Sequence, residues 1–126
     1  MIRFNLFSKP LLLFLIFACN SSAQNGSYTN IQPDGLDELL NSKDVTIIDV
    51  RTPQEWEGGI VDGALTININ GPGFLNQIGE LDKDENYLIY CRTGNRSRTA
   101  SRIMTEHGFE NIYNFDGMHT QIRSER

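Results

Sequence analysis

The chain has 126 residues, of which 39% are hydrophobic and 21% charged, and its formal net charge is −5 at pH 7. This length allows one domain with a hydrophobic core but not two. The acidic balance excludes proteins that bind phosphate backbones through a basic surface, so no nucleic-acid partner is expected.

Residues 1–23 have the composition of an export signal and are predicted to precede one folded domain, residues 24–126. Arg3 and Lys9 come before an apolar run at 11–18, and this run is too short to span a membrane comfortably. We therefore expect an exported protein rather than one held by a transmembrane helix.

Two cleavage sites remain open in this segment. Cleavage before Cys19 would leave a cysteine for lipid attachment, as in bacterial lipoproteins, and the Asn-Ser-Ser that follows it favours this site. Cleavage after Ala23 would follow small residues of the kind that an ordinary signal peptidase prefers. The expected location is periplasmic or membrane-anchored, and any membrane contact would be through a lipid on Cys19.

From residue 27 onward, short apolar runs alternate with segments of helical spacing. The expected strands are 27–31, 45–50, 64–69, 86–90 and 111–115. Four helices are expected. The first opens at 33–35 with Asp34 as N-cap, the second starts at Glu55, the third contains Phe74 and Ile78, and the fourth covers 98–107. This alternation predicts an α/β fold with three layers, in which helices cover both faces of a central parallel five-stranded sheet.

Asp49 and Arg51 are polar residues at the carboxyl end of the apolar run 45–50. Ligands of open α/β sheets gather outside this edge, so both side chains are candidates to support a site there. The other interpretation is a structural ion pair or a helix cap. We favour it because structural pairs are the common alternative to functional ones.

Cys91 ends the run 86–90 and begins a polar loop that leads into the helix expected at 98–107. A helix N-terminus presents unpaired N–H groups and partial positive charge, and Arg92 and Arg96 add full charges. Such surroundings lower the pKa of a thiol from about 8.5 into the range of roughly 3.5 to 7.5. The alternative, a small buried hydrophobic residue, suits a cysteine inside an apolar run rather than at its end. We therefore predict that Cys91 is a reactive nucleophile.

The other polar candidates in this half of the chain are assigned no catalytic role. Arg98 and Arg102 lie one turn apart and are expected on the solvated face of the helix. His107 and His119, together with the single loop cysteine, lack the spacing of metal ligands. We therefore expect no metal and no other cofactor.

Four motifs in order carry a family resemblance. They are Cys91-x-x-Gly94-x-Arg96-Ser97, the Asp-x-Arg-x-x-x-Glu-aromatic pattern within 48–56, the turn 59–64, and Asp116-Gly117-Met118. Over residues 28–122 the chain resembles rhodanese-like domains, the single-domain sulfurtransferases. It departs from them at Ile60, where the family's turn usually has a histidine, and it lacks the Trp that often follows the closing glycines.

The resemblance implies a mechanism as well as a fold. The Cys91 thiolate would attack the outer sulfur of a small anionic donor such as thiosulfate, and a thiol or cyanide would accept that sulfur from the Cys91 persulfide. Loop N–H groups would stabilise the sulfur while Arg92 and Arg96 orient the donor, Arg96 being the one that matches the motif. The substrate-binding residues implied in this way are Arg92, Thr93, Gly94, Asn95, Arg96 and Ser97.

Three alternatives to this function stay open. A cysteine phosphatase or arsenate reductase also presents Cys and Arg in such a cradle, but with one residue more between them than the four found here. A binding module on the same fold would not need Cys91. A persulfide carrier that serves a partner protein would keep Cys91 and never use thiosulfate.

Overall fold

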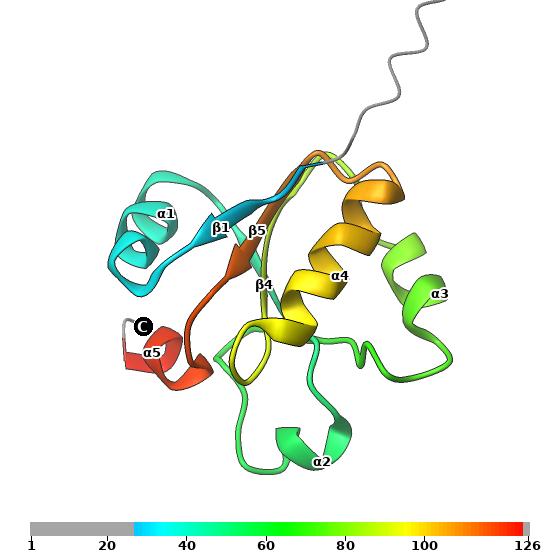
Figure 1. Cartoon of the computed structure of the whole chain (residues 1–126), viewed down its shortest axis with the longest axis horizontal. Coiled ribbons are helices and arrows are strands. Elements are labelled where there is room, and N and C mark those ends of the chain that lie inside the picture. The colour runs from blue at the N-terminus through cyan, green and yellow to red at the C-terminus, as the bar shows by residue number, and fades with distance from the viewer. Residues whose placement is uncertain (1–26, 125–126) are drawn as a thin grey trace, which may run out of the picture.

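Five parallel strands form the centre of the molecule, in the order β1-β5-β4-β2-β3 (Figure 1). The computed structural model describes residues 27–124, so the predicted export segment, Cys19 included, lies outside the described residues. The strands are β1 Thr29–Ile31, β2 Thr46–Asp49, β3 Leu65–Thr66, β4 Asn86–Tyr90 and β5 Asn111–Phe115. The helices are the 3-10 turn η1 Pro33–Gly35, α1 Leu36–Ser42, α2 Pro53–Trp56, α3 Phe74–Gly79, α4 Asn95–Glu106 and α5 His119–Ser124.

A separate hydrophobic core lies on each face of the sheet. Successive strand residues point to opposite faces, so Ile47 packs in the cluster that α1 and α5 complete, and Ile48 packs in the cluster that α3 and α4 complete. Figure 1 shows the same division, with α1 and α5 on one side of the strands and α3 and α4 on the other. Burial on both faces explains why these strands read as continuous apolar runs. The predicted three-layer α/β fold is confirmed.

The central strand β4 delivers Cys91 to the middle of one edge of the sheet. Its last residue, Tyr90, pairs with Asp49 of β2. The Tyr90 carbonyl also accepts a hydrogen bond of 3.0 Å from the Val50 N–H, just past the end of β2. Cys91 therefore leaves the sheet at its carboxyl edge, where open α/β sheets bind ligands. The turn into α4 and the short helix α2 lie at this same end of the molecule (Figure 1).

Several local predictions differ from the structure. Strands β1 and β2 are shorter than the expected 27–31 and 45–50, and α2 begins at Pro53 rather than at Glu55. Helix α4 begins at Asn95 instead of residue 98, because its first turn is built from polar loop residues that carry no apolar periodicity. Strand β3 covers Leu65–Thr66 instead of 64–69, since the ladder with β2 runs over these two residues and only single backbone bonds from Ile67 and Ile69 continue it. Asp34 is not an N-cap, since it lies inside η1, whose first turn has no side-chain cap and begins with proline.

Helix α5 was not expected from the sequence. It has six residues, and its buried apolar residue is Ile122, which packs with α1 in one of the two cores. One buried apolar residue produces no helical periodicity, and a helix this short is not stable by itself in water. Tertiary packing therefore decides that this segment is helical.

Candidate active site

The side chain of Cys91 lies inside the turn between β4 and α4, with 2% of the residue exposed. The Gly94 N–H donates a hydrogen bond of 3.1 Å to Cys91 Sγ, and Sγ lies 3.6 Å from Ser97 Oγ. The Ser97 hydroxyl donates to the Gly94 carbonyl at 3.0 Å and so ties the first turn of α4 to the loop. Thr93 and Asn95 are exposed on the outside of the turn. The sulfur is therefore held among hydrogen-bonding groups at a helix N-terminus.

These groups change the acidity of the thiol in opposite directions. Burial raises the pKa of Cys91, whereas hydrogen bonding with the Ser97 side chain and with the backbone N–H groups of Ser97, Thr93 and Gly94 lowers it. The hydrogen bonds outweigh burial, so the pKa of Cys91 lies below the ordinary value for a thiol. Because the thiolate is the nucleophilic form, reactivity should rise with pH through this lowered pKa and disappear in acid.

Gly94 is the one residue of the loop whose backbone requires glycine. Its φ is 98°, in the left-handed region that residues with a Cβ rarely adopt. A Cβ there would lie 2.7 Å from Oδ1 of Asp116. Asp116 accepts hydrogen bonds from Arg98 at 2.9 Å and from Gln32 at 3.2 Å, which hold its carboxylate in place. Asp116, which directly follows β5, therefore packs against the cysteine loop.

Arg96 makes a bidentate ion pair with Glu55 of α2. Its NH1 lies 2.6 Å from Glu55 Oε2 and its NH2 lies 2.7 Å from Oε1. Each of the two side chains is 28% exposed. The Arg96 hydrogen bonds hold the pKa of Glu55 well below its usual range, although burial acts against them, so the pair is ionised at any neutral pH. The two-nitrogen end of Arg96, which we expected to meet an anionic donor, is thus occupied by a carboxylate.

Glu55 is the residue of this site that sequence reasoning missed. In the sequence, Glu55 belongs to the Asp-x-Arg-x-x-x-Glu-aromatic pattern and is predicted to start a helical turn. The signal that could have revealed it is the Thr52-x-x-Glu55 spacing of a capping box, which predicts a carboxylate fixed at a helix start. The spacing shows that the carboxylate is fixed, but it does not show what the carboxylate contacts.

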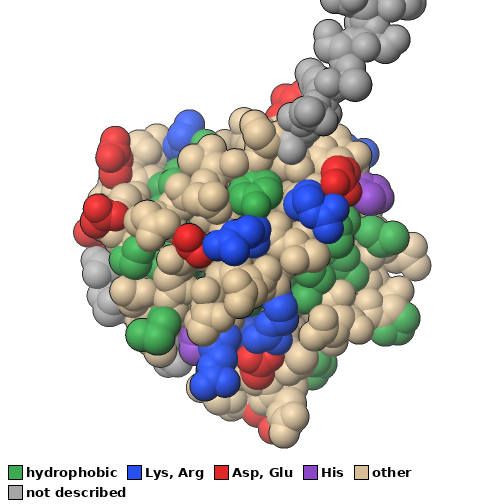
Figure 2. All heavy atoms as spheres, in the orientation of Figure 1, with side chains coloured by type: hydrophobic (Ala, Val, Ile, Leu, Met, Phe, Trp, Pro, Cys, Tyr) green, Lys and Arg blue, Asp and Glu red, His purple; other side chains and the backbone are tan. Residues whose placement is uncertain are grey.

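The face that carries α4 has basic and acidic side chains lying beside one another (Figure 2). Arg98 pairs with Asp116 and Arg102 pairs with Glu106, and both arginines are exposed, which confirms the solvated face expected for them. Arg92 differs from them. It directly follows Cys91 in the loop and is exposed, and within residues 27–124 it makes no ion pair.

Asp49 and Arg51 form a buried ion pair under the loop, with 0% and 3% of the residues exposed. Arg51 NH2 lies 2.7 Å from Asp49 Oδ2, and the Tyr90 hydroxyl donates to the same oxygen at 2.6 Å. Burial and the Asp49 carboxylate raise the pKa of Tyr90, so its hydroxyl remains a donor. The ring of His119 from α5 stacks on Tyr90 with 6.4 Å between centroids. The structural interpretation of Asp49 and Arg51 is therefore the one the geometry supports, because their hydrogen bonds go to this network and not to Cys91.

The same network fixes the turn that follows α2. Arg51 NH2 donates to the Gly59 carbonyl at 2.7 Å, and the Val61 N–H donates to the Tyr90 hydroxyl oxygen at 3.1 Å. Ile60, which stands where the family's turn usually has a histidine, lies between these two anchored residues. The side chains of Arg51 and Tyr90 hold the turn through its backbone groups, so it needs no histidine for this purpose.

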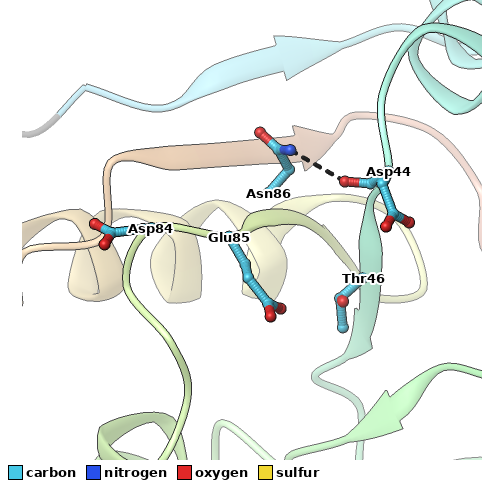
Figure 3. Close-up of a pocket in the computed structure, with 5 residues that line it drawn as sticks. All are labelled: Asp44, Thr46, Asp84, Glu85 and Asn86. Atoms are coloured by element: carbon cyan, nitrogen blue, oxygen red, sulfur yellow. Dashed lines mark hydrogen bonds between the residues drawn. The ribbon is translucent and has the colours of Figure 1, made fainter.

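A pocket of about 370 Å³ lies at the opposite edge of the sheet, at the amino ends of β2 and β4 (Figure 3). Asn86 closes part of it through a 3.0 Å hydrogen bond from its side-chain amide to the Asp44 carbonyl. Its lining residues are Asp44, Thr46, Asp84, Glu85 and Asn86. Its acidic lining would repel an anionic sulfur donor. Within residues 27–124, no group of His, Cys, Asp and Glu side chains could hold a metal ion.

The position of Cys91 on the sheet edge and the cradle around its sulfur define a class of protein. Members of this class are α/β proteins that present one nucleophilic cysteine on a strand–loop–helix turn. Within that class the chain belongs to the Rhodanese-like domain family, which matches residues 32–124. The resemblance noted over residues 28–122 is confirmed.

Named relatives extend this result. The thiosulfate sulfurtransferase GlpE of Shewanella oneidensis is 30% identical over 91 residues, which are 72% of this chain and 88% of that protein. A tRNA uridine(34) hydroxylase of Cytophaga hutchinsonii is 33% identical over 91 residues, which are 70% of this chain but 29% of that protein. The crystal structure of a rhodanese-like domain protein from Staphylococcus aureus matches with a TM-score of 0.64 and 29% identity, over 75% of this chain and 90% of that one. These likenesses support a sulfurtransferase-like activity.

Proposed function

We propose that the protein transfers sulfane sulfur from thiosulfate or a similar anionic donor to a thiophilic acceptor through a persulfide on Cys91. The observation that carries this proposal is the Cys91 sulfur itself, buried in a hydrogen-bonding cradle that lowers its pKa. Such a cradle stabilises negative charge on Sγ before the reaction and on the outer sulfur after it. The GlpE-named relative supports the choice of thiosulfate.

The two half-reactions balance without any other oxidant or reductant. In the first, the Cys91 thiolate attacks the outer sulfur of thiosulfate, so a Cys91 S–S bond forms, the S–S bond of thiosulfate breaks, and sulfite leaves with the electron pair. In the second, cyanide or a thiolate attacks the outer sulfur of the persulfide, the Cys91 S–S bond breaks, and the thiolate is restored. No separate general base is required when the thiolate forms before the donor binds, and the lowered pKa of Cys91 favours that form.

The test of this function is a thiosulfate-to-cyanide assay on the protein. Incubation with thiosulfate should add the mass of one sulfur atom to the chain, and later addition of cyanide should remove that mass and release thiocyanate. Absence of both the added mass and the thiocyanate would contradict the proposal.

A second candidate function is persulfide carriage for a partner protein. Met118 favours it, because this large apolar residue is 57% exposed and lies two residues after Asp116, which packs on Gly94 of the loop. The hydroxylase-named relative, in which the matching part is 29% of the protein, shows that similar domains occur within longer proteins. Under this alternative Cys91 would accept sulfur from a thiol persulfide but not from thiosulfate, so the two donors should be compared in the same assay.

We propose, from the sequence pattern alone, that the protein is exported and is cleaved either before Cys19, which is then lipidated, or after Ala23. Within residues 27–124, no helix has the length and apolar character needed to cross a membrane. Mass spectrometry of the protein made in a bacterial host should show either a diacylated Cys19 or a new N-terminus at Gln24. A cytosolic protein that retains Met1 would contradict export.

A further inference from the structure

We propose that Glu55 is a positioning residue of the sulfur-transfer site: it holds the Arg96 guanidinium in place in the first turn of α4, directly after the cysteine loop, and so leaves donor binding to Arg92. The inference rests on the proposed function for its reference to a donor. The motif suggests that Arg96 mainly orients the donor. The inference instead gives donor binding to Arg92 and stabilisation of the Cys91 thiolate and persulfide to Arg96. The inference also makes α2 part of the site, although α2 follows β2 and Cys91 follows β4.

The Glu55 carboxylate is fixed before it meets Arg96. Its Oε2 accepts hydrogen bonds of 3.0 Å from both the Thr52 N–H and the Thr52 hydroxyl, while the Glu55 N–H lies 3.4 Å from Thr52 Oγ1. These contacts form a reciprocal capping box. Thr52 itself follows Arg51, which the buried pair with Asp49 anchors to the sheet. The carboxylate is therefore tied through short local contacts to the sheet edge that also carries Cys91.

Arg96 is in turn oriented by the bidentate pair. Two parallel N–H···O contacts of 2.6 and 2.7 Å restrict both the position and the rotation of a planar guanidinium. Arg96 belongs to the first turn of α4, next to Ser97, whose hydroxyl lies 3.6 Å from Cys91 Sγ. The Glu55 hydrogen bond is the main factor that raises the pKa of Arg96, burial opposes it, and the charge of Cys91 raises it further. Glu55 therefore fixes Arg96 in the first turn of α4, and the direction of the Arg96 pKa shift agrees with a favourable effect of the Cys91 charge.

Arg92 is in the opposite situation. It is exposed and makes no ion pair within residues 27–124, whereas a donor that approached the two-nitrogen end of Arg96 would have to displace Glu55. Displacing a partly buried bidentate pair by a hydrated anion is unfavourable, because charge-assisted bidentate contacts are the stronger class of hydrogen bond. An anionic donor should therefore meet Arg92, while Arg96 stabilises the thiolate and the persulfide.

The experiment measures two quantities separately: the pH at which the Cys91 thiolate forms, and the KM for thiosulfate. Iodoacetamide is a neutral electrophile, so the pH dependence of Cys91 alkylation reports the thiolate and not an anion site. Glu55→Gln should move the midpoint of this alkylation upward by about 0.5 to 1 pH unit, because a loosened Arg96 stabilises the thiolate less. Arg92→Ala should leave that midpoint unchanged and raise the KM for thiosulfate by about tenfold, the loss expected for one charged contact. The matched control is Glu57→Gln, an exposed carboxylate next to α2, which should change neither measurement.

Two further variants separate positioning from a general loss of structure. Thr52→Ala removes a hydrogen bond to the Glu55 carboxylate without changing any charge, and it should shift the midpoint in the same direction by a smaller amount. In an Arg96→Met background, Glu55→Gln should no longer raise the midpoint, since Glu55 acts through Arg96. Thermal unfolding of each variant shows whether it is folded at the assay temperature.

Shifts of the alkylation midpoint and of the KM in the direction opposite to the expected one would overturn the inference. If Glu55→Gln lowers the alkylation midpoint and lowers the KM for thiosulfate, Glu55 competes with the donor for Arg96 and does not position it. If Arg92→Ala shifts the midpoint as far as Glu55→Gln does, the two arginines do not divide the work. Failure of the proposed function has a different signature, because the wild type would then release no thiocyanate while the Glu55 shift in alkylation remained.

Discussion

Replacing Cys91 with serine is expected to lower sulfur transfer by at least about a thousandfold, to the background of the assay, because a serine hydroxyl is neither ionised nor able to form a persulfide. The fold should persist. Serine is close in size to cysteine, and its oxygen can accept the 3.1 Å hydrogen bond that the Gly94 N–H now donates to Sγ. Thiocyanate release and the added sulfur mass measure the first effect, and thermal unfolding measures the second.

The matched control for this variant is Cys19→Ser in the full chain, because Cys19 is the only other cysteine of the sequence. This variant should retain full transfer activity. If Cys91→Ser kept activity near that of the wild type, the sulfur would have to travel through another group, and the mechanism proposed for Cys91 would be wrong.

Removing the Asp49 carboxylate is expected to destabilise the domain by about 3 to 5 kcal/mol, since it leaves the buried Arg51 charge without its partner. Asp49→Ala also removes the acceptor of the Tyr90 hydroxyl, a second buried polar group that would lose its hydrogen bond. Equilibrium denaturation in urea gives the change in the free energy of unfolding. Because Arg51 and Tyr90 also hold Gly59 and Val61, the turn after α2 should loosen as well.

An exposed aspartate provides the comparison for this variant. Asp34 is exposed in η1, so Asp34→Ala should leave the free energy of unfolding nearly unchanged. A similarly small change for Asp49→Ala would show that Arg51 finds another partner or reaches water, and the buried pair would then not hold this edge of the sheet together.

Elements whose formation depends on local residue patterns could be predicted from the amino-acid order. Strands β4 and β5 match the expected ranges 86–90 and 111–115, because both are short segments rich in aromatic and branched aliphatic residues. The place of Cys91 followed from the same logic, since a cysteine that ends a buried strand and opens a polar loop can lie only in the turn to the next helix. The class of fold followed from the alternation of strands with helices.

Contacts between segments far apart in the sequence became evident only in the folded molecule. Glu55 and Arg96 are 41 residues apart, and they pair because β2 and β4 are neighbours in the sheet, which brings α2 to the start of α4. Strand order is not encoded in local periodicity, so the spacing of residues could indicate that each side chain is fixed but not what it contacts. The six-residue helix α5 depends in the same way on packing against α1 through Ile122. The Glu55–Arg96 pair and helix α5 are both stabilised by contacts between different elements. The residue pattern along a single element contains no information about such contacts.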